Sequence, residues 1–208
     1  MQAPERQAES PFRGLYTEVH AFWLAGMSCD GCSIAVTGAT NPSVEDLLTG
    51  ALPGLPRIVL HHPVLDVDAG ERFVSWYERA ARGELGAPYV VIYEGSVPDE
   101  EVAAETGGYW SGMGVREVGG TRQPMPTAEW LRRLAPGAAA VIAIGTCATW
   151  GGIPAAIGNP TGAMSVMDFL GPEYRSALGL PVINIPGCSP VGDNFTETVA
   201  AILLFLQG

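Results

Sequence analysis

The sequence predicts an α/β fold in which helices cover both faces of a parallel sheet. Short apolar runs recur along the chain, and most residues of each run are hydrophobic. Stretches with helical spacing separate the runs, and turn residues bound them. Strands that are apolar throughout are typical of a sheet buried on both faces, and strands that alternate with helices are typical of a parallel sheet. The chain has 208 residues, of which 47% are hydrophobic and 16% charged, so it can build such a core.

Five apolar runs supply the strands of this sheet, for which we expect a flavodoxin-like strand order. Val, Ile and Leu are frequent in them, as they are in buried strands. In chain order the runs cover residues 19–24, 57–65, 89–93, 138–144 and 181–185. The start of the chain is polar and contains proline. We therefore expect a flexible N-terminal arm over residues 1–16 and one domain over residues 17–208.

Helical patterns lie between the apolar runs. Ser43 and Asp46 have the spacing of a capping box, which predicts a short helix that ends at Thr49. Residues 71–82 repeat apolar side chains at helical intervals. The side chains that share one face of this predicted helix are Phe73, Trp76, Tyr77 and Ala80.

The remaining segments have weaker patterns. Residues 107–126 are rich in glycine, which predicts a long loop, and residues 146–180 predict only short helices. Thr127 is expected to cap a helix that carries the next apolar residues. A final helix, opened by Asp193 or Asn194, is expected to run to residue 206.

Charge and hydropathy argue against several classes of protein. The net charge is −11, from 22 acidic and 11 basic residues, and nucleic-acid binding needs clustered Lys and Arg. No apolar run approaches the roughly 20 residues of a membrane span, so no transmembrane segment is expected. The N-terminus lacks a basic-then-apolar signal pattern. We therefore expect a cytoplasmic location, with any membrane association supplied by partners.

The four cysteines follow the C-terminal ends of three predicted strands. Cys29 and Cys32 form a Cys-x-x-Cys pair after the first strand, Cys147 follows the fourth strand, and Cys188 follows the fifth. Ligands of open α/β sheets bind at this edge, and a cytosolic setting argues against structural disulfides. A [4Fe–4S] cluster takes four thiolates, one for each iron. We therefore predict that these four cysteines are the ligands of one metal centre.

Other interpretations of the cysteines stay open on the residues alone. A buried cysteine is often a small hydrophobic residue, although this poorly explains four cysteines at strand ends. A thioredoxin-like dithiol leaves Cys147 and Cys188 without a role. A structural zinc ion also accepts four thiolates, usually from two paired motifs. A flavin-binding module would need a Ser/Thr-rich phosphate loop after the first strand, and residues 27–33 are a poor version of one.

Four segments in a fixed order resemble the small subunit of nickel–iron hydrogenases. They read CDGCS at 29–33, EGSVP at 94–98, GTCATWGGI at 145–153 and PGCSP at 186–190, and NPTGA at 159–163 looks similar too. Each motif is weak alone, whereas the ordered set spans most of residues 17–207. The residues of these motifs look closer to those of uptake-type members of the family than to those of the short bidirectional members.

The resemblance implies a flavodoxin-like fold with a proximal [4Fe–4S] cluster on the four cysteines. It implies a large-subunit partner that carries the nickel–iron centre, a downstream electron carrier, and hydrogen oxidation or proton reduction by the complex. The cysteines would be ligands, so no residue of this chain is assigned a catalytic role. Many uptake-type members continue into a C-terminal domain with further cysteines. We therefore expect the chain to be the N-terminal, proximal-cluster part of a longer small subunit.

One related family is the alternative to this assignment. Iron–sulfur subunits of respiratory quinone reductases share the fold, but they typically place two cysteines side by side. The separated Cys29 and Cys32 argue against that family.

Several other residues have two interpretations each. Glu94 ends the third predicted strand, where it either passes protons and bonds the cluster surroundings or bonds loop amides. His61 and His62 lie in the second strand pattern, and packing is favoured over proton relay for both. Trp110 and Trp150 are expected to pack in the core or at an interface.

Overall fold

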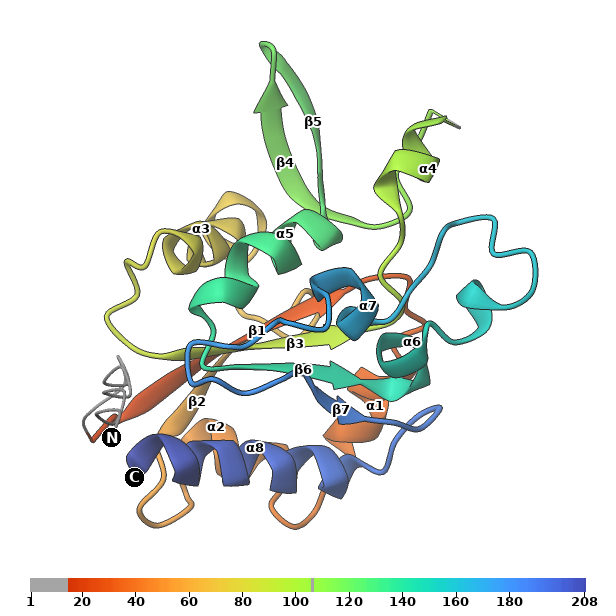
Figure 1. Ribbon diagram of the computed structural model, residues 1–208. Coiled ribbons are helices and arrows are strands. Elements are labelled where there is room, and N and C mark those ends of the chain that lie inside the picture. Colours follow the sequence, from red (N-terminus) through yellow and green to blue (C-terminus); the bar gives the residue numbers. More distant parts are fainter. Residues whose placement is uncertain (1–14, 106) are drawn as a thin grey trace, which may run out of the picture.

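A five-stranded parallel sheet forms the centre of the structure, a computed structural model that describes residues 15–105 and 107–208. The strands lie in the order β2-β1-β3-β6-β7 (Figure 1). Their bounds are Glu18–Ala25 (β1), Arg57–His61 (β2), Tyr89–Glu94 (β3), Ala140–Ile144 (β6) and Ile183–Ile185 (β7). Counted within the sheet, this is the order 2-1-3-4-5 with all neighbours parallel. The predicted flavodoxin-like fold is therefore confirmed.

The central strands are buried along their lengths, which explains why their sequences carry so few polar residues. Every residue of β3 and β6 is buried, and so are six consecutive residues of β1. The register pairs Ala25 with Glu94 and Glu94 with Ile144. The strands β1, β3 and β6 therefore end side by side, and the loops that follow them start from the same edge of the sheet.

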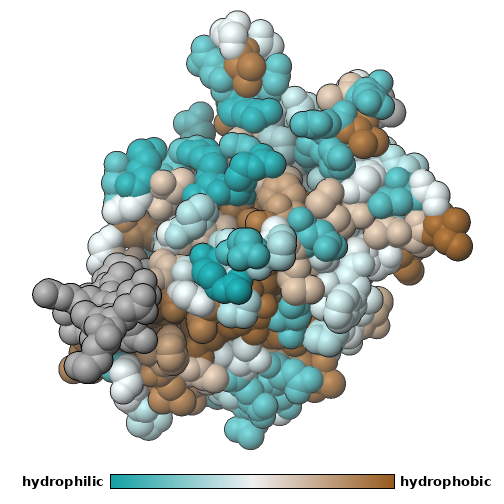
Figure 2. Space-filling model, in the orientation of Figure 1, coloured by the Kyte–Doolittle hydropathy of each residue, from teal (hydrophilic) through white to brown (hydrophobic). Residues whose placement is uncertain are grey.

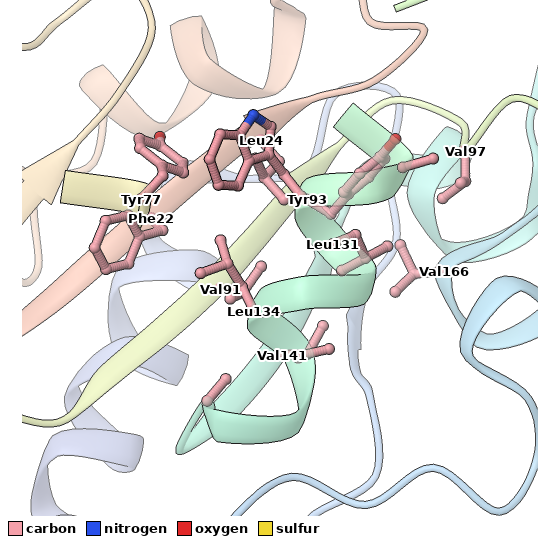
Figure 3. Packing of buried hydrophobic residues seen from close by; sticks show 14 of the residues in the cluster. Phe22, Leu24, Tyr77, Val91, Tyr93, Val97, Leu131, Leu134, Val141 and Val166 are labelled. Carbon is pink, nitrogen blue, oxygen red and sulfur yellow. The ribbon is translucent and has the colours of Figure 1, made fainter. Parts of the chain in front are cut away.

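One face of the sheet packs against α3 (Gly70–Ala81) and α5 (Thr127–Leu134), with α7 (Val166–Leu170) beside them (Figure 1). The predicted helix over residues 71–82 is confirmed, with both its start and its end one residue earlier. Figure 3 shows the buried side chains of this layer meeting between the strands and the helices. Those that are fully buried include Phe22, Leu24, Tyr77, Val91, Leu131 and Leu134.

The opposite face packs against α1 (Gly31–Thr37), α2 (Val44–Thr49) and α8 (Gly192–Gln207). The capping box of α2 is confirmed, because Ser43 accepts from the Asp46 amide and Asp46 accepts from the Ser43 amide. The predicted cap of α8 is wrong. The Asp193 carboxylate instead accepts hydrogen bonds from the amides of Thr40 and Asn41, and α8 begins without a side-chain cap.

The glycine-rich segment is a β-hairpin, so the predicted long loop is wrong. Strand β4 (Gly112–Val118) pairs antiparallel with β5 (Thr121–Pro126), and the hairpin protrudes from the body of the domain (Figure 1). Gly119 and Gly120 form its turn, with φ of 58° and 79°. Two-residue hairpin turns of this kind need positive φ at both positions. The glycines therefore serve a tight turn.

Other expected boundaries shift for local reasons. Strand β2 ends at His61 instead of residue 65, because Pro63 cannot donate to a strand ladder. Thr127 does not cap α5, and its hydroxyl bonds the Ser111 side chain instead. Helix α4 (Glu100–Glu105) was not predicted. The stretch 146–180 carries only short helices, as expected: α6 (Gly145–Trp150), η2 (Ile153–Ala155) and α7, while η1 (Ala135–Gly137) precedes β6.

Two expectations concern the chain as a whole. Most of the predicted arm over residues 1–16 falls outside the described residues, and the domain boundary stays a prediction. Within the described ranges, no helix combines the length and the apolar character that crossing a membrane requires.

Candidate metal centre

The four cysteines line a single cavity at the carboxyl edge of the sheet. Cys29 and Cys32 lie in the turn after β1 and the first turn of α1, Cys147 lies in α6, and Cys188 lies in the loop after β7. The cavity has a volume of about 220 Å³. The other residues that line it are Ser28, Gly31, Glu94, Gly95, Thr146, Gly187 and Ser189. The structure thus brings together all four residues that the sequence assigned to one centre.

Hydrogen bonds between the loops hold the cavity wall together. The Thr146 amide donates to the Gly187 carbonyl at 2.8 Å, which joins the segments that carry Cys147 and Cys188. The Met27 amide donates to the Ser96 carbonyl at 2.9 Å, which joins the loops after β1 and β3. The buried Ser96 hydroxyl then donates to the Gly151 carbonyl at 2.6 Å. Loops from four strands are therefore tied to one another independently of any ligand.

The donor set fits a polynuclear cluster better than a single metal ion. All four thiols are free. In the described part of the chain, no three His, Cys, Asp or Glu side chains are grouped closely enough to hold one ion. A zinc ion would need the sulfurs about 2.3 Å from one point. Thiols placed around a cavity suit a cluster that binds one cysteine at each iron.

Two glycines leave room for the sulfur atoms. A Cβ atom on Gly145 would collide with Sγ of Cys32, and one on Gly152 would collide with Sγ of Cys147. Both glycines also have positive φ, 89° and 58°, a conformation that other residues rarely adopt. Close approach of the backbone to the cysteines therefore requires glycine at these two positions.

The electrostatics of the cavity favour a bound cation. Burial raises the pKa of the Cys32 thiol to about 12, and the Glu94 carboxylate and the other three cysteines act in the same direction. The Cys32 thiol donates to the Ile144 carbonyl at 3.7 Å. Among the described residues that line the cavity, none is basic. The protein alone therefore disfavours the thiolate of Cys32, whereas a coordinated metal ion would stabilise it.

Glu94 accepts four hydrogen bonds beside the cavity. Its Oε1 accepts from the amides of Cys32 (2.9 Å) and Ser33 (3.2 Å), and its Oε2 accepts from Trp23 Nε1 (3.0 Å) and Ser33 Oγ (2.5 Å). Its side chain is buried, with 1% of the residue exposed. Glu94 thus hydrogen-bonds the surroundings of the cavity through backbone amides of α1, and a role in proton transfer stays a prediction.

Sequence reasoning did not identify Ser33 and Trp23 as parts of this site. Their contacts with Glu94 join residues 61 and 71 positions apart. Trp23 offered one signal, because an indole N–H inside a buried apolar strand needs an acceptor. Ser33 belongs to the CDGCS motif, but nothing in that motif predicts its bond to Glu94.

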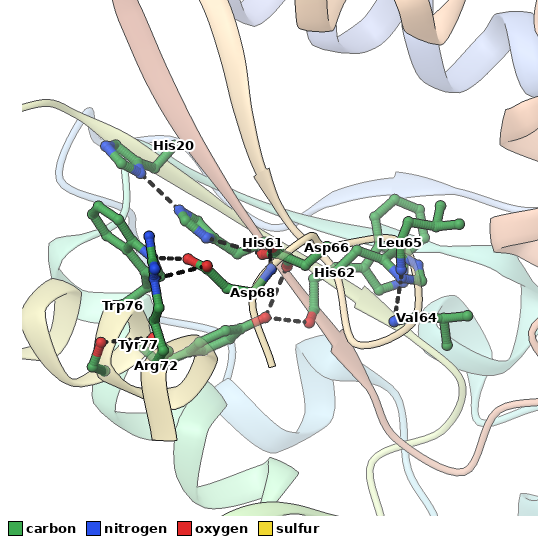
Figure 4. Close-up of polar contacts among 12 residues, drawn as sticks. His20, His61, His62, Val64, Leu65, Asp66, Asp68, Arg72, Trp76 and Tyr77 are labelled. Carbon is green, nitrogen blue, oxygen red and sulfur yellow. Dashed lines mark hydrogen bonds and ion pairs between the residues drawn. The ribbon is translucent and has the colours of Figure 1, made fainter. Parts of the chain in front are cut away.

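The histidines divide between two places. His20 Nδ1 and His61 Nε2 are 2.8 Å apart, and both rings pack near Trp76 on the α3 side of the sheet (Figure 4). Neither lines the cysteine cavity, and the two buried rings stack on each other. His62 instead contacts Ser33, with 2.9 Å between Nε2 and Oγ. His62 therefore adjoins the candidate centre through one intervening side chain.

The two tryptophans lie at the surface. Trp110 is 39% exposed and Trp150 is 66% exposed, so neither packs in the core and the interface alternative is the one that remains for both. Trp150 ends α6, three residues after Cys147. An interface role for it stays a prediction.

Comparisons with known proteins are consistent with this geometry. A family model described as NADH ubiquinone oxidoreductase, 20 kDa subunit, matches residues 29–202. The chain is 36% identical over 184 residues to the Hydrogenase-2 small chain of Escherichia coli K12, covering 88% of this chain and 42% of that one. It is 32% identical over 180 residues to the periplasmic [NiFeSe] hydrogenase small subunit of Desulfomicrobium baculatum, covering 86% and 53%.

Solved structures have the same fold. An actinobacterial-type NiFe-hydrogenase from Ralstonia eutropha H16 superposes with a TM-score of 0.86 at 48% identity, over 93% of this chain and 55% of that one. The Desulfomicrobium baculatum [NiFeSe]-hydrogenase superposes with a TM-score of 0.72 at 30% identity, over 88% and 61%. The chain thus spans about half the length of the proteins it matches.

Proposed function

Because the chain belongs to the family of nickel–iron hydrogenase small subunits, we propose that it holds a proximal [4Fe–4S] cluster. The ligands are Cys29, Cys32, Cys147 and Cys188. In this proposal the chain carries electrons between the nickel–iron centre of a large subunit and a downstream carrier. The reaction of the complex is the oxidation of hydrogen.

One observation carries this proposal: four free thiols from three separate loops line one cavity at the sheet edge. A [4Fe–4S] cluster, when bound, supplies a one-electron carrier whose potential depends on nearby hydrogen bonds and burial. The chain supplies the thiolates and a rigid frame. Gly145 and Gly152 admit the sulfur atoms, and Glu94 fixes the backbone of Cys32.

The rim of the cavity supports a protein partner at this edge. Cys29 and Cys188 are exposed, so the cavity opens to the surface. Large apolar side chains are exposed within a few residues of the cysteines: Ile34 (69%), Trp150 (66%), Ile153 (85%) and Val191 (64%). The segment after α6 protrudes on the right of Figure 1, and Figure 2 shows a small group of hydrophobic atoms at that edge of the molecule. Apolar surface of this kind is typical of an interface, and the large subunit is the proposed occupant.

The test is a metal and sulfide analysis of the complex. The chain is produced together with its large subunit and purified without oxygen, and iron and acid-labile sulfide are measured. We expect at least four irons and four sulfides for each chain, and loss of this signal when Cys147 or Cys188 is replaced by Ser. Stoichiometric zinc without sulfide in the parent protein would contradict the proposal.

A respiratory quinone-reductase subunit is the second candidate, favoured by the description of the matching family model. Activity distinguishes the two candidates. Hydrogen-dependent reduction of a viologen dye by the purified complex is expected for the hydrogenase. Quinone reduction without any response to hydrogen would favour the second candidate.

A further inference from the structure

His62 is a buried side chain whose hydrogen bonds define its tautomer. It follows β2 directly and is 4% exposed, with its ring centroid 5.0 Å from that of Trp23. Its Nδ1 accepts from the amides of Val64 (3.1 Å) and Leu65 (3.3 Å) (Figure 4). Burial lowers the pKa of His62, so the ring is neutral at pH 7. Because Nδ1 is an acceptor, the single ring proton lies on Nε2.

The proton on Nε2 determines which atom is the donor in the next two hydrogen bonds. Nε2 of His62 donates to Oγ of Ser33 at 2.9 Å. The hydroxyl hydrogen of Ser33 is then available to Oε2 of Glu94, at 2.5 Å. One hydrogen bond therefore joins the loop after β2 to α1, and a second joins α1 to the end of β3. In both bonds the donor is the group nearer to His62.

Glu94 in turn holds the start of the helix that carries Cys32. Asp30, at the N-cap position of α1, makes no side-chain cap hydrogen bond. The free amides of Cys32 and Ser33 donate to Oε1 of Glu94 instead. The backbone of the Cys-x-x-Cys turn is thus held by a strand residue that lies 62 positions after Cys32.

We propose that His62 is a positioning residue for this cysteine turn, acting through Ser33 and Glu94. The inference rests on the proposed function, since it concerns how the cluster ligands are held. A serine hydroxyl can also turn to a nearby backbone acceptor, which would take its hydrogen away from Glu94. The bond from His62 occupies the Ser33 oxygen and leaves its hydrogen for Glu94. The carboxylate then keeps the orientation that orders the amide of Cys32.

Two substitutions of His62 separate its two bonds. In His62→Asn the side-chain oxygen reaches the position of Nδ1, so the loop amides keep their acceptor while Ser33 loses its donor. In His62→Gln the terminal N–H reaches the position of Nε2, so Ser33 keeps its donor while the loop amides lose their acceptor. Each variant therefore keeps one of the two hydrogen-bonding partners of His62 and loses the other.

The experiment measures hydrogen exchange at single amides in the complex with the large subunit, under anaerobic conditions. In His62→Asn we expect the amides of Cys32 and Ser33 to exchange about tenfold faster, the size expected for one lost hydrogen bond. The amides of Val64 and Leu65 should stay protected. In His62→Gln the amides of Val64 and Leu65 should exchange faster, while those of Cys32 and Ser33 should stay protected. The electron paramagnetic resonance spectrum of the reduced cluster should change in His62→Asn and match the parent in His62→Gln.

The chain offers a control and a second variant. His20→Asn removes another buried histidine that has no bond to the cysteine turn, and it should leave exchange at Cys32 and Ser33 unchanged. Ser33→Ala should speed exchange at Cys32 as His62→Asn does, and the double variant should add nothing further. Ser33→Ala also carries the test if His62→Asn fails to fold.

The outcomes separate this inference from the proposed function. Parent-like exchange at Cys32 in both His62→Asn and Ser33→Ala, with the four-iron signal intact, would overturn the positioning role alone. A parent complex without a four-iron signal would overturn the proposed function, and the inference with it.

Discussion

At the scale of single residues, Glu94 shows how a carboxylate is accommodated in the interior. It lies at the end of a strand whose six residues are all buried. Its two oxygens accept four hydrogen bonds, from Trp23 Nε1, Ser33 Oγ and the amides of Cys32 and Ser33. No ion pair among the described residues involves it. Burial of an unpaired carboxylate is costly, so we infer that its donors are essential to this edge of the sheet.

A substitution of Gly145 tests whether the backbone approach to the cysteines is functional. Gly145→Ala places a Cβ against Sγ of Cys32 at a residue with φ of 89°. We expect a loss of about 1 kcal/mol or more from the positive φ, and a loss of bound iron from the collision. Gly83→Ala is the control, because Gly83 has φ of 70° and open space around it.

Urea unfolding and iron analysis of both variants measure the two effects. Both should lower the unfolding midpoint, while only Gly145→Ala should lose iron. Equal iron content in the two variants would show that the space beside Cys32 is not needed.

At the scale of secondary-structure elements, Tyr77 connects α3 to two strands. Its ring is fully buried, and its hydroxyl lies 2.8 Å from both the Trp23 carbonyl of β1 and the His61 carbonyl of β2. The chain leaves β2 at His61, and the loop that carries His62 starts there. Helix α3 therefore holds the last residue of β2 in place, and His62 is the next residue in the chain.

Tyr77→Phe removes this hydroxyl while keeping the ring. We expect a loss of about 1–2 kcal/mol in the free energy of unfolding, because the buried carbonyls lose a donor. Tyr109→Phe is the control, since its hydroxyl is at an exposed residue and bonds Gln123 at 3.2 Å. Denaturant unfolding of both variants gives the comparison, and equal stabilities would mean that water replaces the Tyr77 hydroxyl.

At the scale of the whole molecule, all three histidines are buried and all three have lowered pKa values. Burial is the largest cause in each case, and it lowers the pKa of His20 to about 4. The unfolded chain binds these protons near the ordinary histidine pKa of about 6.5. Folded and unfolded chains are both neutral at these sites above that pH. Below it, the unfolded chain binds more protons, so stability falls as the pH falls towards 4.

The pH dependence of unfolding checks this expectation. The urea midpoint of the parent should decrease between about pH 6.5 and pH 4. His20→Gln should lower the urea midpoint at pH 7. Its midpoint should then decrease less steeply than that of the parent between about pH 6.5 and pH 4, because one of the three histidines is gone. Identical slopes for parent and variant would show that His20 does not contribute to the linkage.

The proposed partner face gives a second prediction at this scale. Trp150→Asp places a charge on an apolar, exposed position three residues after Cys147 in α6. If the large subunit covers this face, its affinity should fall at least tenfold, as for a buried aromatic anchor. Val118→Asp on the protruding hairpin, at a residue that is 44% exposed, is the control. Co-purification and a binding titration measure the difference, and unchanged affinity in Trp150→Asp would place the partner elsewhere.

The sequence by itself determined the fold class and the place of the four cysteines. Apolar runs separated by helical spacing specify parallel strands buried on both faces, and such strands present their C-terminal loops at one edge. Because each cysteine follows a strand, convergence could be predicted from order alone. Glycine content was less informative, since Gly119 and Gly120 serve a hairpin turn and Gly145 serves the cavity.

Only the tertiary structure decided how the cysteine turn is held. Glu94, Ser33 and His62 come from three different elements, and their bonds depend on strand register and side-chain rotamers. Local periodicity reports which face of an element is buried, but it does not report which polar groups meet across that face. The network beside the cysteines could therefore be found only once the strands and helices were placed in space.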